Sequence, residues 1–306
     1  MTSNNPENGT SFAATEHSQS GAGPIFRLPR SMTALETWGF GLSGHLSWFF
    51  TIPLIAVALG PNTILLMLPA VGIGMLFNFQ IRRLGEQWLE MAGGTPNYIT
   101  HLLKRYPRLG CYAAIGYWLA WVASAPMNAI ILTNLIKANL EPLGITCPES
   151  LLKIGFTLLP YVLAFSGSRA LAILHLFFVL PAVGFSLLFC WQGINWLAFS
   201  PSSPGLLPPL DLKTITAVPF QDWAKWLFFA LWLTTGCDTA AAFVADSRRP
   251  EKTLRFLTFA AWLIPPVFLG TAWVLMRLAT DPTGGGDIFQ IVLAAAKPFW
   301  GKEVSL

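Results

Sequence analysis

The sequence predicts an all-α integral membrane protein with about seven transmembrane helices. Of its 306 residues, 54% are hydrophobic and only 11% are charged, and the mean hydropathy is +0.55. Roughly a quarter of the residues of a typical soluble domain are charged, so a soluble fold could not cover this much apolar surface. Several stretches also lack Asp, Glu, Lys and Arg over the roughly 20 residues that a helix needs to cross a bilayer.

The chain begins with a segment that differs from the rest. Residues 1–28 are rich in Ser, Asn, Gly and Thr and lack the apolar run of a signal peptide, which predicts a disordered cytoplasmic tail. A charge-free stretch follows over 37–81. The turn signal Gly60-Pro61-Asn62 divides it into two helices, predicted at 38–59 and 63–81.

The other spans are bounded by basic residues or by turns rich in Pro and Gly. They are predicted at 109–136, 154–168, 170–196, 223–245 and 256–276. The segment 154–168 is short for a span, so Lys153 has to extend its side chain toward the membrane surface. The apolar segment 288–300 is too short to cross a bilayer.

The distribution of basic residues predicts a cytoplasmic N-terminus, because cytoplasmic loops accumulate Lys and Arg. With this orientation 12 of the 19 basic residues lie inside, namely Arg27, Arg30, Arg82, Arg83, Lys104, Arg105, Arg108, Arg169, Arg248, Arg249, Lys252 and Arg255. We expect a multi-pass protein of the cytoplasmic (plasma) membrane, in contact with the lipid bilayer. The sequence has no basic stripe with interleaved aromatic residues, which argues against a nucleic-acid partner.

The first predicted span contains a glycine-rich, polar stretch. Gly39-Phe40-Gly41-Leu42-Ser43-Gly44 matches a dinucleotide-binding pattern, but it lies inside a span instead of following a strand. One interpretation is close packing of helices. The other is a broken helix whose freed backbone groups face a cavity, which the polar side chains of Ser43 and His45 favour.

The span 223–245 contains a second polar stretch. Thr234-Thr235-Gly236-Cys237-Asp238 places hydroxyls, a glycine and a carboxylate in an apolar helix. An ionisable residue within a membrane is costly, so Asp238 is either functional or held by hydrogen bonds. Two interrupted helices, each the first of a group, predict a binding site at the middle of the membrane. His175, in the span 170–196, either carries a proton or packs through a hydrogen bond.

Three segments, at 93–98, 115–121 and 236–250, carry a resemblance to the amino acid–polyamine–organocation transporter superfamily, and this resemblance covers nearly all of 30–306. Gly93-Gly94-Thr95-Pro96-Asn97-Tyr98 resembles its Gly-Gly-x-x-x-Tyr segment. Ile115-Gly116-Tyr117-Trp118-Leu119-Ala120-Trp121 resembles the aromatic opening of its third helix. Gly236-Cys237-Asp238, followed by Phe243 to Pro250, resembles the Gly-Phe-Glu motif and the acidic, basic, proline ending of its sixth helix.

The resemblance implies a fold of two inverted five-helix repeats, like that of the leucine transporter, in which the first and sixth helices unwind at mid-membrane. It implies a first repeat over 29–196 with helices 1–5 and an extracytoplasmic loop over 197–221. A partial second repeat, 222–306, holds helices 6 and 7 and an outer segment, so we expect a truncated sequence. Two positions depart from the family: Gly41-Leu42-Ser43-Gly44-His45 replaces Gly-Ser-Gly-Ile-Phe, and Asp238 replaces Glu.

The expected function is secondary active transport of an amino acid or related amine, coupled to a proton or a sodium ion and without covalent chemistry, cofactor or metal. Free N–H groups after Ser43 and Gly44 would bind the substrate carboxylate, and carbonyls near Thr234 to Gly236 the ammonium. The expected substrate-binding residues are Gly41, Ser43, Gly44, His45, Thr234, Thr235, Gly236 and Cys237, with Asp238 and His175 in structural or coupling roles.

A seven-helix membrane receptor or sensor is the alternative that the helix count alone would favour. Two features oppose it. The span 256–276 contains no Lys for a retinal Schiff base, and the basic residues place the N-terminus inside.

Overall fold

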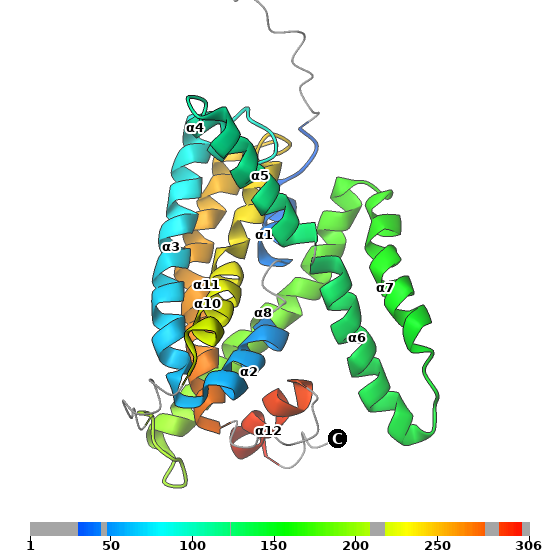
Figure 1. Cartoon of the computed structure of the whole chain (residues 1–306), viewed down its shortest axis with the longest axis vertical. Coiled ribbons are helices and arrows are strands. Elements are labelled where there is room, and N and C mark those ends of the chain that lie inside the picture. The colour runs from blue at the N-terminus through cyan, green and yellow to red at the C-terminus, as the bar shows by residue number, and fades with distance from the viewer. Residues whose placement is uncertain (1–29, 44–47, 123, 209–217, 279–287, 302–306) are drawn as a thin grey trace, which may run out of the picture.

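The structure is a computed structural model that describes residues 30–43, 48–122, 124–208, 218–278 and 288–301 (Figure 1). These residues are predominantly helical, and the only β-type pairing among them is an isolated bridge between Met32 and Ser247. Five helical stretches are long and apolar enough to cross a membrane: Thr51–Gln87, Pro107–Lys137, Ser168–Phe199, Phe220–Phe243 and Pro250–Leu278. The all-α class is confirmed, and these lengths are those of a multi-pass membrane protein.

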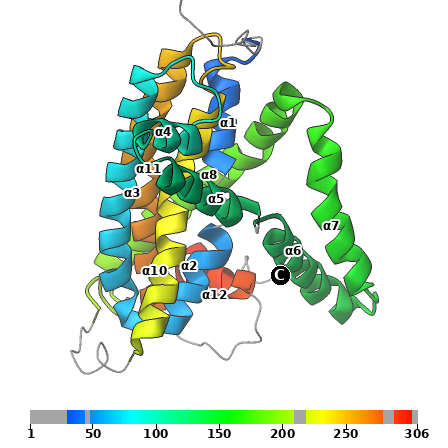
Figure 2. The ribbon, with the colours of Figure 1, turned by 45° about the horizontal axis from the view of Figure 1, so that its top comes forward.

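The bundle is built around three long helices. Helix α3 (Thr63–Gln87) packs against both α10 (Phe220–Thr235) and α11 (Pro250–Leu278), as Figures 1 and 2 show. Glycines allow these helices to approach closely, because a Cβ at Gly74 would lie 2.5 Å from the Thr234 Cβ and one at Gly85 would lie 2.5 Å from Leu254 Cδ2. Small residues serve the same purpose in membrane helices generally.

Shorter helices complete the bundle. Helix α1 (Ala34–Ser43) packs against α8 (Ser168–Phe199) and against the 3₁₀-helix η3 (Gly236–Phe243). Helix α2 (Trp48–Leu59) contacts α11 and α12 (Ile288–Trp300). The core holds large, fully buried apolar side chains from all of these regions, including Ile52, Met67, Phe189, Leu233 and Phe256.

The observed helices differ from the predicted spans in their bounds. The first span, 38–59, is divided between α1 and α2, and residues 44–47 lie outside the described residues. The predicted turn is the 3₁₀-helix η1 (Gly60–Asn62), where Gly60 has a φ of +53° that glycine adopts without strain. The predicted segment 154–168 is α7 (Glu149–Ala164), which begins earlier because the acidic side chain of Glu149 suits a helix N-terminus.

The span predicted at 109–136 lies within the helical stretch Pro107–Lys137. The structure describes this stretch as helix α5 (Pro107–Val122) and helix α6 (Ser124–Leu140), on either side of residue 123, which lies outside the described residues. The two helices meet at an angle in Figures 1 and 2. Helices α6 and α7 pack on each other and form a hairpin that stands away from the central bundle.

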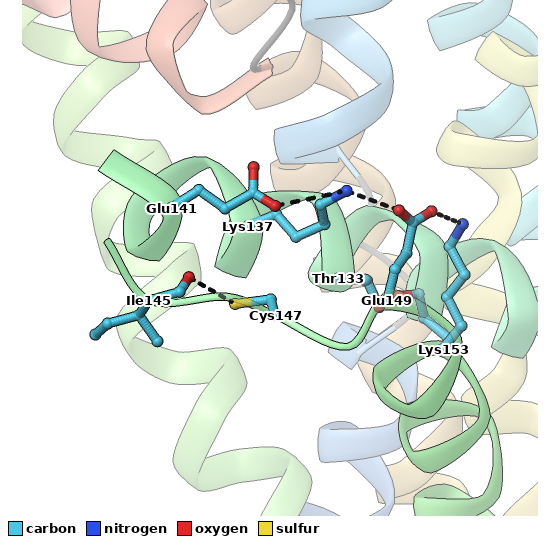
Figure 3. A network of polar contacts seen from close by, with 8 residues as sticks. Thr133, Lys137, Glu141, Ile145, Cys147, Glu149 and Lys153 are labelled. Carbon is cyan, nitrogen blue, oxygen red and sulfur yellow. Dashed lines mark hydrogen bonds and ion pairs between the residues drawn. The ribbon is translucent and has the colours of Figure 1, made fainter. Parts of the chain in front are cut away.

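Figure 3 shows a charge network at the tip of this hairpin. The Glu149 carboxylate lies between the ammonium groups of Lys137, at 2.7 Å, and of Lys153. Glu141 approaches the same Lys137 at 3.8 Å. Hydrogen bonds from Lys137 and then from Lys153 lower the pKa of Glu149 to about 2. The network therefore joins the end of α6 to the start of α7.

Polar contacts also tie together the end of the bundle where α1 and α11 begin. Arg30 pairs with Glu90, and Arg169 at the start of α8 pairs with Glu36 at 2.8 Å. The Arg248 N–H donates to the Met32 carbonyl at 2.8 Å. The basic residues predicted to face the cytoplasm, where the structure describes them, lie near helix ends or in turns at this end of the bundle. Position 27 and the predicted tail, 1–28, lie outside the described residues.

Candidate functional site

The helical form changes in the middle of an apolar span. Helix α10 ends at Thr235, and η3 continues from Gly236 as a 3₁₀-helix of eight residues. Runs of this form are usually three or four residues long, and a 3₁₀ stretch within a helix often marks a hinge. The hydroxyls of Thr234 and Thr235 bond the carbonyls of Ala230 at 3.0 Å and Leu231 at 2.9 Å. Such back-bonding, followed by a glycine, weakens the α-helix here.

Asp238 lies just after this change and is 2% exposed. Its Oδ2 accepts hydrogen bonds from Thr95 Oγ1 at 2.7 Å and from the Tyr117 hydroxyl at 3.0 Å. Thr95 begins α4 (Thr95–Leu102), and Tyr117 comes from α5. Among the residues that the structure describes, no Lys, Arg or His lies within ion-pair distance of this carboxylate. Burial of a carboxylate without a cation requires such donors.

Two glycines position Thr95. Gly93 and Gly94 have φ angles of +87° and +62°, which favour glycine. A Cβ at Gly94 would lie 2.5 Å from the Ala242 backbone nitrogen, so this turn lies directly on the backbone of η3. The Gly93 N–H points at the Ala242 carbonyl at 3.4 Å. A side chain at position 94 would push α4, and with it Thr95, away from Asp238.

The two polar stretches that the sequence singled out are neighbours in space. Thr239 Oγ1 in η3 donates to the Phe40 carbonyl in α1 at 2.9 Å. Gly41 lies against the same region, because a Cβ there would be 2.2 Å from Phe256 Cε1 and 2.9 Å from the Ala240 Cβ. At Gly41, therefore, the glycine serves close packing of α1 on η3 and α11.

The other expected substrate-binding residues have distinct surroundings. Ser43 is the last residue of α1, whereas Gly44 and His45 lie outside the described residues. Thr234 is buried against α3, where its hydroxyl donates to the Ala70 carbonyl at 3.0 Å. Thr235 is half-buried, and Gly236 and Cys237 are buried.

The carbonyls expected to bind an ammonium already have partners. The Thr234 carbonyl accepts from Asn78 Nδ2 at 3.3 Å, and the Gly236 carbonyl accepts from Thr239 Oγ1 at 3.0 Å. The Thr234 carbonyl therefore joins α10 to α3, whereas the Gly236 carbonyl accepts within η3 from a hydroxyl whose single proton it shares with the Phe40 carbonyl. The sequence alone does not predict the bond from Asn78, because it forms only when α3 and α10 pack together.

An aromatic wall, defined here as Tyr117, Trp121 and Trp232, lies beside Asp238. The ring centroids of Tyr117 and Trp121 are 6.3 Å apart, and those of Trp121 and Trp232 are 5.9 Å apart. The Trp232 indole N–H is buried without a hydrogen-bond partner within the described ranges. The motif around position 117 was a signal for this wall, but no sequence pattern paired it with Trp232.

His175, in α8, packs against α1. Its ring lies edge-on to Phe40 with the centroids 4.9 Å apart. Its Nδ1 is buried, and no described residue bonds it. His175 is therefore not among the described hydrogen-bond partners of Asp238.

Comparisons of the chain with protein-family models, curated proteins and solved structures find no match. Within the described part of the chain, no group of three or more His, Cys, Asp or Glu could hold a metal ion, and none of the four cysteines forms a disulfide. The arrangement offers hydrogen bonds, helix ends and aromatic faces for a polar ligand, together with one buried carboxylate.

Proposed function

We propose that the protein is a secondary active transporter that carries an amino acid or a related amine across the plasma membrane. One observation carries this proposal: the span 220–243 changes from α to 3₁₀ form at Gly236, beside the buried carboxylate of Asp238. Irregular helices occur at membrane depth where they line a cavity or are covered by protein, and transporters use them to bind substrates and ions.

The substrate in this proposal lies between the end of α1 and η3. The last four carbonyls of an α-helix have no partner within the helix, and that end carries a partial negative charge. The proposal places the ammonium group near Ser43, the last described residue of α1. It places the carboxylate near Trp48, the first described residue of α2.

The aromatic wall supports a cationic substrate group. A cation within about 6 Å of a Trp or Tyr face gains roughly 0.5–2 kcal/mol, more when it is shielded from water. Trp121 packs on Tyr117, which bonds Asp238 in η3, and Trp232 packs on Trp121, so the proposal assigns these faces to the ammonium group. In this proposal the second partner of the ammonium group is the aromatic wall. The carbonyls of Thr234 and Gly236 do not take that role, because both accept other hydrogen bonds.

Asp238 holds η3 to α4 and α5 through Thr95 and Tyr117. We assign it a structural role in this conformation. When these bonds open during transport, the carboxylate needs a proton or another cation, because an unpaired charge is costly at this depth. The proposed coupling ion, a proton or a sodium ion, is the cation that Asp238 takes when its hydrogen bonds open. His175 is a second candidate for carrying the proton.

The proposal includes membership of the amino acid–polyamine–organocation superfamily, with its inverted repeats and a cytoplasmic N-terminus. The three segments that carry the resemblance contribute Thr95, Tyr117 and Asp238, and these meet in one hydrogen-bonded cluster. This supports the proposed membership, because residues that form one site are expected to occur together in a family.

Uptake into proteoliposomes tests the proposal. The full-length protein, given an inward proton or sodium gradient, is expected to take up at least one member of a panel of radiolabelled amino acids and amines in a saturable way. Asp238→Ala should abolish this uptake, whereas Asp222→Asn should leave it unchanged because Asp222 is exposed in the first turn of α10. Folded wild-type protein that takes up no member of the panel under either gradient would contradict the proposal.

A further inference from the structure

A cavity of about 520 Å³ opens where α11 begins, at the end of the bundle that carries most of the basic residues. Its volume is within the range of about 300–1,000 Å³ that is common for small-ligand sites. Charged side chains dominate its lining, which consists of Arg30, Leu89, Glu90, Arg248, Arg249, Pro250, Glu251 and Lys252. None of these residues belongs to the Asp238 cluster.

Three chain segments form the walls and are fixed to one another. Backbone hydrogen bonds join the segment around Met32 to the segment before α11. The Met32 N–H donates to the Asp246 carbonyl at 3.2 Å, and the Arg248 N–H donates to the Met32 carbonyl at 2.8 Å. Thr253 Oγ1 in α11 donates to Ser247 Oγ at 2.8 Å and lies 3.1 Å from Thr37 Oγ1 in α1. The cations therefore stand on a backbone that is held in place.

The charges in the cavity do not cancel. Arg30 is paired with Glu90. Among the described residues, no carboxylate lies within ion-pair distance of Arg248, Arg249 or Lys252. Glu251 is the one acidic residue of the lining without an ion pair there, and its place in the first turn of α11 complements the helix dipole. Three cations beside the N-terminus of a 29-residue helix form a site for an anion.

We propose that this cavity binds the phosphate group of an anionic phospholipid headgroup. Arginine pairs with phosphate through two parallel hydrogen bonds, and basic pockets between transmembrane helices bind anionic headgroups. The cavity lies at the end of the long apolar helix α11, which is the depth of the headgroups in a bilayer. Leu89 and Pro250 add an apolar wall that a glycerol backbone or acyl chain contacts but a free phosphate ion does not use.

The test compares a fluorescent phosphatidylglycerol with the matching phosphatidylcholine on the purified full chain in a neutral detergent. Wild-type protein should bind phosphatidylglycerol at least about tenfold more tightly. Arg248→Gln with Arg249→Gln should weaken this binding about 30-fold, since each basic residue near an anionic surface contributes about 1 kcal/mol and about 1.4 kcal/mol is tenfold in affinity.

Two controls separate a site from general surface charge. Lys104→Gln with Arg108→Gln removes the same charge from the same end of the bundle, outside the cavity, and should change the affinity less than about twofold. Arg248→Lys with Arg249→Lys keeps the charge but loses the paired hydrogen bonds of arginine, so its affinity should fall between that of the wild type and that of the glutamine variant. An equal loss in the Lys104 and Arg108 variant, or no loss in the Arg248 and Arg249 glutamine variant, would overturn the site.

Competition with inorganic phosphate distinguishes a lipid headgroup from a free phosphate ion as the ligand of this cavity. Inorganic phosphate should compete weakly with phosphatidylglycerol, even at high millimolar concentration, because it lacks the apolar contacts. Complete displacement by millimolar phosphate would show a site for free phosphate compounds and overturn the lipid assignment.

Discussion

Thr239 in η3 donates a hydrogen bond from its hydroxyl to the backbone carbonyl of Phe40 in α1, at 2.9 Å. Phe40 lies three residues before Ser43, the last described residue of α1. A side chain of the span 220–243 therefore bonds a backbone group of α1. Movement of η3 has to break or carry this bond, which links the two regions between which we place the substrate.

Asp238→Asn should preserve the architecture, whereas Asp238→Ala should not. An amide oxygen still accepts hydrogen bonds from Thr95 and Tyr117, but they weaken without the charge, which predicts a loss of about 1 kcal/mol in the free energy of unfolding. Alanine leaves two donors unpaired and predicts a loss of about 3 kcal/mol. Thermal unfolding in detergent measures the difference, and equal unfolding temperatures for the two variants would contradict the structural role.

Gly41→Ala should destabilise the bundle by about 1–3 kcal/mol through overpacking. The added Cβ would lie 2.2 Å from the Phe256 ring, which is fully buried and stacked on Trp38 with the centroids 5.2 Å apart. Gly72→Ala is the matched control, because its Cβ would meet nothing within 4 Å and alanine favours the helix. If both variants unfold at the same temperature, the packing of α1 on α11 is not as described.

The α6–α7 hairpin should loosen at low pH. The pKa of Glu149 is lowered from its usual value near 4.5 to about 2, first by Lys137 and then by Lys153. A carboxylate with a depressed pKa in the folded state stabilises that state above its unfolded pKa. The contribution is therefore complete above pH 4.5 and disappears as the pH falls through about 2.

Spin labels at Ile130 and Tyr161, both exposed on α6 and α7, can follow this change. Distance measurements at pH 7, 4 and 2 should show a broadening distribution in the wild type. Glu149→Gln should give the broad distribution at every pH, and high salt should have a similar but weaker effect, since the ion pairs are exposed. A narrow, pH-independent distribution in the wild type would show that other contacts hold the hairpin.

Single cysteines on a Cys-free background should report the orientation. Positions 3 and 249 are expected in the cytoplasm, and positions 144 and 203 outside, because 12 of the 19 basic residues lie on the first side. An impermeant thiol reagent added from outside should label only the second set. Strong labelling at 249 without labelling at 203 would reverse the orientation.

The sequence contained the local part of this architecture. Gly60-Pro61-Asn62 is a turn signal, so the turn could be predicted. Threonine hydroxyls and a glycine weaken an α-helix, so the change of helical form after Thr235 could be predicted as well. The angle between α5 and α6 could not be predicted, because a charge-free length carries no information about how a span bends.

The candidate site was predictable only in outline. Asp238 stood out as a carboxylate in an apolar span, but its partners are 143 and 121 positions away in the sequence. Their pairing depends on how α4 and α5 fold over η3. The carbonyl of Thr234 was expected to be free for a ligand, and its hydrogen bond from Asn78 arises only when α3 and α10 pack together.

Equilibrium binding by scintillation proximity, with radiolabelled amino acids and amines on the full-length protein, tests most directly whether substrate binds between α1 and η3. Wild-type protein should bind at least one of these ligands in a saturable way. Gly44→Val should abolish binding by blocking the approach of the ligand to the backbone, while Gly72→Val, on the open face of α3, should bind as the wild type does. Normal affinity in Gly44→Val would show that the site lies elsewhere.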